Sequence, residues 1–290
     1  MIYYILIVLA ALGYAANFAF TKVYQLEQGN TMEKGAIFNC LVGLVGFLIY
    51  FAACGFKMEI TPFSVIIVAL LTLSVGFYTI VGFKIMSIGS MAVYTIFVML
   101  GGMVLPYFYG LIFLGEKITV LKTTALVMMI FAIILQNGGE GKKGTVLFYI
   151  LCSIVFVLNG MTSVLSKIHQ INTKYPVVSA NGFVMLKNLL RFVLFGAMIP
   201  FVKKKDMNIF RMNMKTYISI IGAALVSSVA YVFQLICASY VPATVQFPVL
   251  SGGTIIFTAL FGMIFFHEKM NKKQVISLTV CTVATVLFVI

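Results

Sequence analysis

Long apolar segments fill nearly the whole chain, and short polar breaks separate them. A helix that crosses a bilayer needs about 20 consecutive apolar residues, and most of these segments approach that length. The first of them, MIYYILIVLAALGYAANFAF, lacks the positively charged start of a signal peptide, so we interpret it as a retained span. The pattern predicts ten spans, at 3–24, 35–56, 62–85, 91–113, 120–136, 145–168, 177–202, 216–239, 243–266 and 272–290.

Composition agrees with a membrane protein, because 62% of the 290 residues are hydrophobic and only 9% are charged. These fractions lie far outside the average for soluble domains. We therefore expect an all-α, integral multi-pass membrane protein, located in the bacterial plasma membrane. The net charge of +13 comes from Lys and Arg residues that mostly flank the spans, which favours membrane topology over nucleic-acid binding.

The distribution of basic residues predicts an orientation. One set of loops carries 13 of the 20 Lys and Arg residues, and Lys187 and Arg191 lie inside the seventh span. The other set of loops carries five, which are Lys57, Lys117, Lys122, Lys167 and Lys174. Basic loops tend to stay in the cytoplasm, so the charge count predicts that both termini lie outside.

An internal repeat divides the chain. The segment NGGEGKKG, at 137–144, is a polar linker near the midpoint, and it separates a first repeat at 1–136 from a second at 145–290. Glu116 and Glu268 lie 152 positions apart, and the same shift pairs Tyr94 with Gln246 without a gap. Two copies of five spans must enter the membrane in opposite directions. We therefore predict ten transmembrane helices, arranged as two inverted five-helix repeats around a central cavity.

The repeated motifs also resemble a known family. GFKIMSIGSMAVYTIF with LPYFYGLIFLGEKIT in the first half, and SYVPATVQFPVL with TALFGMIFFHEKM in the second, are similar to EamA-type transporters of the drug/metabolite transporter superfamily. The resemblance implies cytoplasmic termini, against the charge count, so the orientation stays open. It also implies that the first, third, fourth, sixth, eighth and ninth spans line the cavity.

Polar side chains within the spans are the candidates for substrate binding. Lys187 and Arg191 are four residues apart, so one helix face carries both and offers them to an anion or carboxylate. Uncharged residues on the cavity-lining spans could hold a zwitterion or a neutral polar molecule, or could instead bridge helices. These uncharged candidates are Tyr14, Asn17, Tyr78, Tyr94, Asn159, Tyr231, Gln234 and Gln246.

The acidic residues point away from cation transport, because all seven map to loops or span ends. A proton-driven cation exporter normally needs a carboxylate at membrane depth. We interpret Glu116 and Glu268, with Gly115, as structural turn residues. Glu116 is expected at the positive end of the next helix, which Thr119 can cap, and Asn271 with Gln274 resembles a capping box.

The sequence therefore predicts a secondary transporter that moves a small organic metabolite by alternating access. The expected metabolite is an amino-acid-like zwitterion, a neutral molecule or an anion. The alternatives are a multidrug or cation exporter, a lipid-linked sugar flippase, and a membrane scaffold that transports nothing. Expected partners are the substrate, the lipid bilayer, and a coupling proton or counter-substrate, but no nucleic acid. We expect a monomer or a homodimer. The chain shows no ATP-binding, catalytic or metal-binding motif, so no enzyme activity, cofactor or metal is predicted.

Overall fold

The computed structural model describes residues 1–29, 31–88, 91–137, 145–201 and 212–290. These residues form ten α-helices and one short 3-10 helix, and they contain no strand. The predicted linker at 137–144 lies outside the described residues, except for its first residue. The α-helices are α1 (Ile2–Gln28), α2 (Met32–Ala53), α3 (Pro62–Ile88), α4 (Met91–Phe113), α5 (Val120–Asn137), α6 (Val146–Ile171), α7 (Ala180–Met198), α8 (Met214–Tyr240), α9 (Ala243–Phe266) and α10 (Lys272–Val289).

Local capping sets where several helices begin. Thr31, Ser179 and Asn213 each accept a hydrogen bond from a backbone N–H in the first turn of α2, α7 and α8. The capping box predicted at the start of α10 is present, with Asn271 and Gln274 bonding reciprocally. Short polar residues between apolar runs therefore both end the membrane segments and start the next helices.

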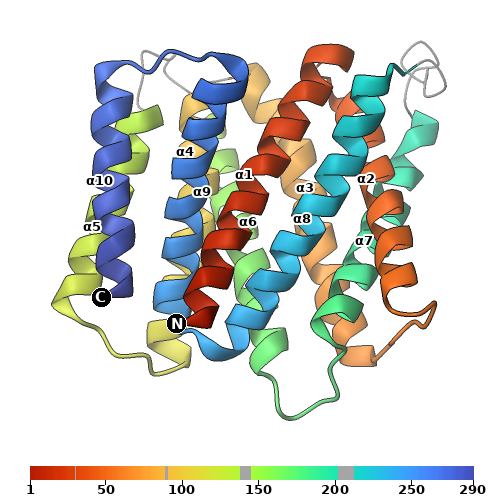
Figure 1. The fold of residues 1–290 in the computed structure, drawn as a ribbon, viewed down its shortest axis with the longest axis horizontal. Coiled ribbons are helices and arrows are strands. Elements are labelled where there is room, and N and C mark those ends of the chain that lie inside the picture. Colours follow the sequence, from red (N-terminus) through yellow and green to blue (C-terminus); the bar gives the residue numbers. More distant parts are fainter. Residues whose placement is uncertain (30, 89–90, 138–144, 202–211) are drawn as a thin grey trace.

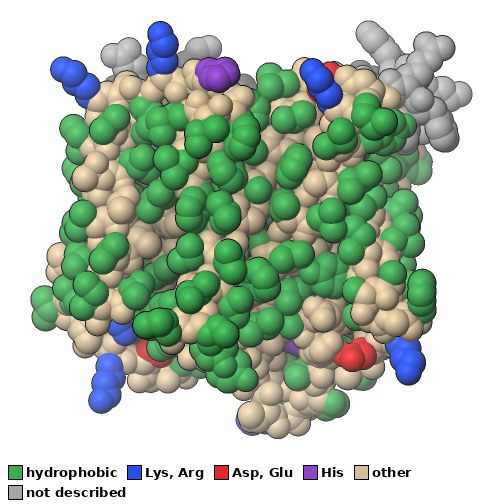
Figure 2. All heavy atoms as spheres, viewed as in Figure 1, with side chains coloured by type: hydrophobic (Ala, Val, Ile, Leu, Met, Phe, Trp, Pro, Cys, Tyr) green, Lys and Arg blue, Asp and Glu red, His purple; other side chains and the backbone are tan. Residues whose placement is uncertain are grey.

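The surface has the character of a membrane protein. Eight of the described helices are long and apolar enough to cross a bilayer, and α5 contributes a shorter apolar stretch, Val120–Leu135. Figure 2 shows hydrophobic side chains over the height of the molecule, with Lys, Arg, Asp and Glu gathered at its two rims. Because a soluble protein would bury such a band, the molecule is an integral multi-pass membrane protein.

The helices run back and forth between two faces (Figure 1). We call one the lower face: it holds both termini and the turns at 54–61, 114–119, 172–179 and 241–242. The upper face holds the turn between α9 and α10, at 267–271, and the end of α1. Helices of the first half pack mainly on helices of the second half, as α1 on α8, α2 on α7, α4 on α6 and α5 on α10. The two halves are thus interleaved rather than side by side.

Candidate functional site

The basic pair lies on α7, in the part of the bundle where α2, α3 and α8 pack against that helix. The Nζ atom of Lys187 lies 3.3 Å from the centroid of the Tyr231 ring. Arg191 donates from Nε and Nη2 to Oδ1 of Asn39 on α2, at 3.2 and 2.6 Å. Both basic side chains are half-buried. The pair is therefore held in place by an aromatic ring and an amide oxygen.

Among the described residues, neither cation of this pair has an acidic partner. The ion pairs found there are Lys22 with Glu268 and Lys215 with Glu27, which involve other residues. A cation taken out of water without a counter-ion is costly, and such residues in membrane proteins usually face a cavity or a ligand. The structure thus presents two uncompensated positive charges inside the helix bundle.

Four tyrosines from four helices gather beside this pair. Tyr78 on α3 lies close enough to interact electrostatically with Arg191, and also with Tyr14, Tyr94 and Tyr231 on α1, α4 and α8. The Tyr231 hydroxyl bonds the Oγ of Ser166 at 2.6 Å. Tyr14, Tyr78 and Tyr94 keep part of their surface accessible. Phenol rings next to two cations can contact both an apolar body and a polar group of one small molecule.

The predicted amide residues mostly bridge helices. Tyr14 donates its hydroxyl hydrogen to Oε1 of Gln234 on α8, and Gln246 on α9 donates from Nε2 to the backbone oxygen of Gln234 at 2.6 Å. Asn159 on α6 donates to the carbonyl of Val98 on α4 at 2.7 Å. Gln246 is fully buried, and its Oε1 has no hydrogen-bond partner among the described residues. The helix-bridging interpretation accounts for the bonds that Asn159 and Gln246 make.

The structure thus brings together six of the ten predicted residues, and Tyr14 links Gln234 to this group. The six are Tyr14, Tyr78, Tyr94, Lys187, Arg191 and Tyr231. Asn17 is half-buried on α1, and its backbone oxygen accepts from Thr21 at 2.8 Å. No described contact joins Asn17 to the cluster. We call the group of six the tyrosine and cation cluster.

Sequence reasoning missed three polar residues that the fold places inside. Lys167, which the charge count treats as a loop lysine, lies within α6 and is 4% exposed, so that assignment is wrong. His169 is fully buried and bonds Oγ of Ser64 at 2.8 Å. Asn39 holds Arg191. Its polar side chain inside an apolar span was the signal that could have identified Asn39.

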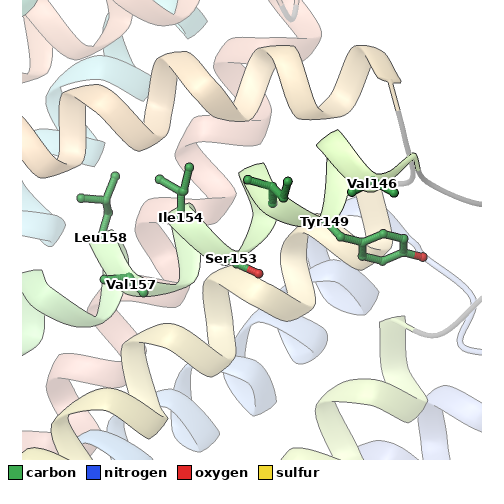
Figure 3. Close-up of a pocket in the computed structure, with 7 residues that line it drawn as sticks. Val146, Tyr149, Ser153, Ile154, Val157 and Leu158 are labelled. Carbon is green, nitrogen blue, oxygen red and sulfur yellow. The ribbon is translucent and has the colours of Figure 1, made fainter.

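Two described hollows lie on the outside of the bundle. One groove of about 550 Å³ follows α6 near its start (Figure 3), and its lining includes Tyr149, Ser153 and Val157. A second, of about 260 Å³, lies between the ends of α1, α9 and α10. Apolar side chains dominate both, as expected of surfaces that face lipid. Neither contains a residue of the tyrosine and cation cluster, so the central cavity stays a prediction.

Comparison with known proteins decides the family. A model of the EamA-like transporter family matches residues 146–290, which is half of the chain. The chain belongs to the EamA-like transporter family. Membership in the EamA-like family places the chain in the drug/metabolite transporter superfamily, as the repeated sequence motifs predicted. Family membership and the long apolar helices together make it a membrane transporter.

A solved structure supports the fold over almost the full length. It is described as "Crystal structure of protein", and it superposes with a TM-score of 0.78 over 98% of this chain and 95% of that chain. Only 11% of the residues are identical, so the likeness concerns the fold alone. A comparison with curated proteins finds no match.

Proposed function

We propose that the chain is a secondary transporter that moves a small organic metabolite, either an anion or an amino-acid-like zwitterion, by alternating access. The observation that carries the proposal is the pair Lys187 and Arg191, which has no acidic partner among the described residues. A substrate carboxylate would supply the missing negative charge through charge-assisted hydrogen bonds. The neighbouring tyrosines would contact the remainder of the molecule.

Alternating access is supported by the repeat, which we propose comprises residues 1–136 and 145–290 with inverted topology. With a shift of 152, the bounds of α3 (Pro62–Ile88) coincide with those of α8 (Met214–Tyr240), and the bounds of α5 with those of α10. One pair of equivalent residues touches across the two halves, Met129 on α5 with Cys281 on α10. A residue can touch its own equivalent only close to a two-fold axis, so this contact supports a pseudo-two-fold axis in the membrane plane.

A cation exporter has less support. The described carboxylates all lie at helix ends or in turns; they belong to Glu27, Glu33, Glu59, Glu116 and Glu268. A membrane-embedded cation normally competes with a proton for a carboxylate at membrane depth. Two positive charges in the cluster would also repel a cationic substrate.

A lipid-linked sugar flippase would use the basic pair to hold a phosphate, and it needs an opening to lipid beside α7. The two described grooves open beside α6 and beside the ends of α1, α9 and α10 instead. We therefore prefer a water-soluble substrate. We further propose that the membrane is the bacterial plasma membrane, that a proton or a counter-substrate couples to transport, and that the carrier is a monomer or a homodimer.

Uptake into proteoliposomes tests the proposal. The panel contains amino acids, small organic carboxylates, neutral polyols and quaternary ammonium compounds. We expect a carboxylate-bearing compound to be transported, and Lys187→Gln and Arg191→Gln to reduce its uptake by about tenfold or more, the effect of losing one charge-assisted bond. Lys174→Gln, which removes a charge from an exposed turn, is the matched control and should retain uptake. Transport of quaternary ammonium compounds alone would overturn the proposal.

A further inference from the structure

The two cations of the tyrosine and cation cluster are held in different ways. Arg191 directs Nε and Nη2 to the side-chain oxygen of Asn39, at 3.2 and 2.6 Å. A guanidinium group keeps its proton in proteins, so Arg191 is a permanent charge in a fixed position. The Nζ atom of Lys187 lies 3.3 Å from the centroid of the Tyr231 ring, and the Lys187 side chain is only half-buried. An ammonium group, unlike a guanidinium group, can release its proton inside a protein.

The surroundings of Lys187 provide no negative charge at neutral pH. The preceding residues of α7, at 183–186, pack in one core cluster with described residues of α2, α3, α6 and α8. Tyrosine and histidine side chains are neutral or positive near neutral pH. The titratable and charged groups in this part of the bundle are Tyr14 of α1, Tyr50 of α2, Tyr78 of α3, His169 of α6, Tyr231 of α8 and Arg191 of α7 itself. Within the described residues, the charge of Lys187 therefore has no counter-charge.

Hydrogen bonds keep two of these tyrosines in the neutral form. Ser166 directs its one hydroxyl hydrogen to the carbonyl of Thr162 at 2.7 Å, so the phenol of Tyr231 is the donor in its 2.6 Å bond to Ser166. Tyr14 likewise donates its hydroxyl hydrogen to an amide oxygen of α8. A phenol that donates its hydrogen to a neutral acceptor carries no charge. Neither ring can therefore balance the charge of Lys187.

An empty carrier would have to enclose two positive charges each time it changes conformation. Alternating access closes the protein over the site and removes water from it. Two cations four residues apart on one helix face repel each other, and a buried charge without a partner is costly. After the substrate carboxylate has left, Arg191 keeps its charge. Loss of the proton from Lys187 is the step by which this site can reduce its charge.

We propose that Lys187 carries the coupling proton of transport, and that one proton moves in the same direction as each substrate carboxylate. This role rests on the function proposed above and specifies its coupling. In the loaded carrier, Nζ holds the proton and the ammonium group pairs with the carboxylate. After substrate release, the proton passes from Nζ to water on the same side of the membrane. The carrier then returns with a neutral amine at position 187, and Arg191 stays charged throughout.

A comparison of exchange with net uptake tests this role in proteoliposomes. Each radiolabelled amino acid and carboxylate of the panel above serves as the probe, and potassium with valinomycin clamps the membrane potential. Exchange is measured with the unlabelled compound inside, so that the carrier is loaded in both directions. Net uptake is measured into empty vesicles in a medium more acidic than their interior, so that the empty carrier must return. The wild-type protein should accumulate the probe, and a protonophore should abolish the accumulation.

Substitutions at position 187 separate the charge from the proton. Lys187→Arg keeps a positive charge that cannot be released, so it should lower net uptake by about tenfold or more beyond any effect on exchange. Lys187→His restores a titratable group and should recover part of the net uptake, but only in a more acidic medium than the wild type needs. It decides the question if Lys187→Arg does not fold. Lys174→Arg makes the same change in an exposed turn and should retain both activities.

The outcomes distinguish the proton role from the proposed function. Accumulation of a probe by the wild type that does not depend on the pH gradient would overturn the proton role and leave the proposed function intact. Equal losses of exchange and net uptake in Lys187→Arg, or a pH dependence of Lys187→His that matches the wild type, would also overturn it. If no amino acid or carboxylate is exchanged, the proposed function fails, and the proton role fails with it.

Discussion

Replacement of Lys187 by methionine tests whether the positive charge of this residue serves substrate binding or the stability of the fold. In the described structure this side chain has no carboxylate partner, and its recorded contact is the Tyr231 ring at 3.3 Å. Such a cation and ring contact contributes about 2 kcal/mol when it is shielded from water. Burial of an uncompensated charge costs several kcal/mol, although partial access to water lowers that cost here. Lys187→Met should therefore leave stability unchanged or raise it by about 1 kcal/mol.

Lys167 provides the matched comparison, because it is also a lysine within a helix of the bundle. Its ammonium group makes two hydrogen bonds to backbone carbonyls, at 2.6 and 2.7 Å, and the side chain is 4% exposed. Methionine would leave both carbonyls without this donor, and each unsatisfied buried group costs about 1–3 kcal/mol. Lys167→Met should therefore destabilise the protein by about 2 kcal/mol or more.

Thermal unfolding in detergent, with uptake into proteoliposomes measured on the same preparations, checks both variants. We expect Lys187→Met to melt at the same or a higher temperature and to lose uptake of the transported carboxylate. Lys167→Met should melt several degrees lower. A clear loss of stability in Lys187→Met, or normal uptake by it, would refute the reasoning that this cation is retained for substrate.

Three further predictions concern packing and capping. Asn39→Ala should lower the free energy of unfolding by about 2 kcal/mol, because it leaves the guanidinium group of Arg191 without its amide partner. A double-mutant cycle with Arg191→Gln should show that the two effects are coupled, and additive shifts of the melting temperature would contradict this. Gly101→Ala should greatly reduce the yield of monodisperse protein in size-exclusion chromatography, because the Cβ atom of the new alanine would lie 2.2 Å from a backbone oxygen of α6. Gly196→Ala is the control and should give the normal yield, because the Cβ atom of its alanine would lie 3.7 Å from the nearest neighbouring atom. Asn271→Ala should lower the free energy of unfolding by about 1 kcal/mol through loss of the capping box, measured as a lower melting temperature. Asn271→Ser should retain most of the wild-type stability, because serine can also cap the helix.

Helix positions were predictable from the sequence because apolar length and capping residues are local signals. The predicted limits 91–113 and 243–266 agree with α4 and α9. The prediction for α6 stopped at residue 168, whereas the helix continues to Ile171, because buried polar side chains near its end find partners on other helices. Polarity marks the end of an apolar run, and it does not mark the end of a helix whose polar groups are satisfied by tertiary contacts.

The candidate site was harder to predict, because hydrogen-bond partners come from segments far apart in the chain. Span membership and polarity selected the tyrosines of α1, α3, α4 and α8, but they did not reveal that Asn159 would bond a carbonyl of α4. The position of Glu116 next to α5 suggested a local role, whereas the fold brings the start of α9 within 2.6 Å of its carboxylate. Local sequence gives the chemical type of such residues, and only the packing of helices gives their partners.

The bond between Asn39 and Arg191 also bears on how a single ten-helix chain differs from a pair of identical subunits. It joins α2 of the first half to α7 of the second half, with an amide on one helix and a cation on the other. In a dimer of two identical five-helix chains, every side chain occurs twice, so a cation in the bundle would come with a second copy of itself. Two such cations at close range repel each other. Because both halves of this bundle belong to one chain, their sequences differ, and the bundle can hold the guanidinium group of Arg191 once.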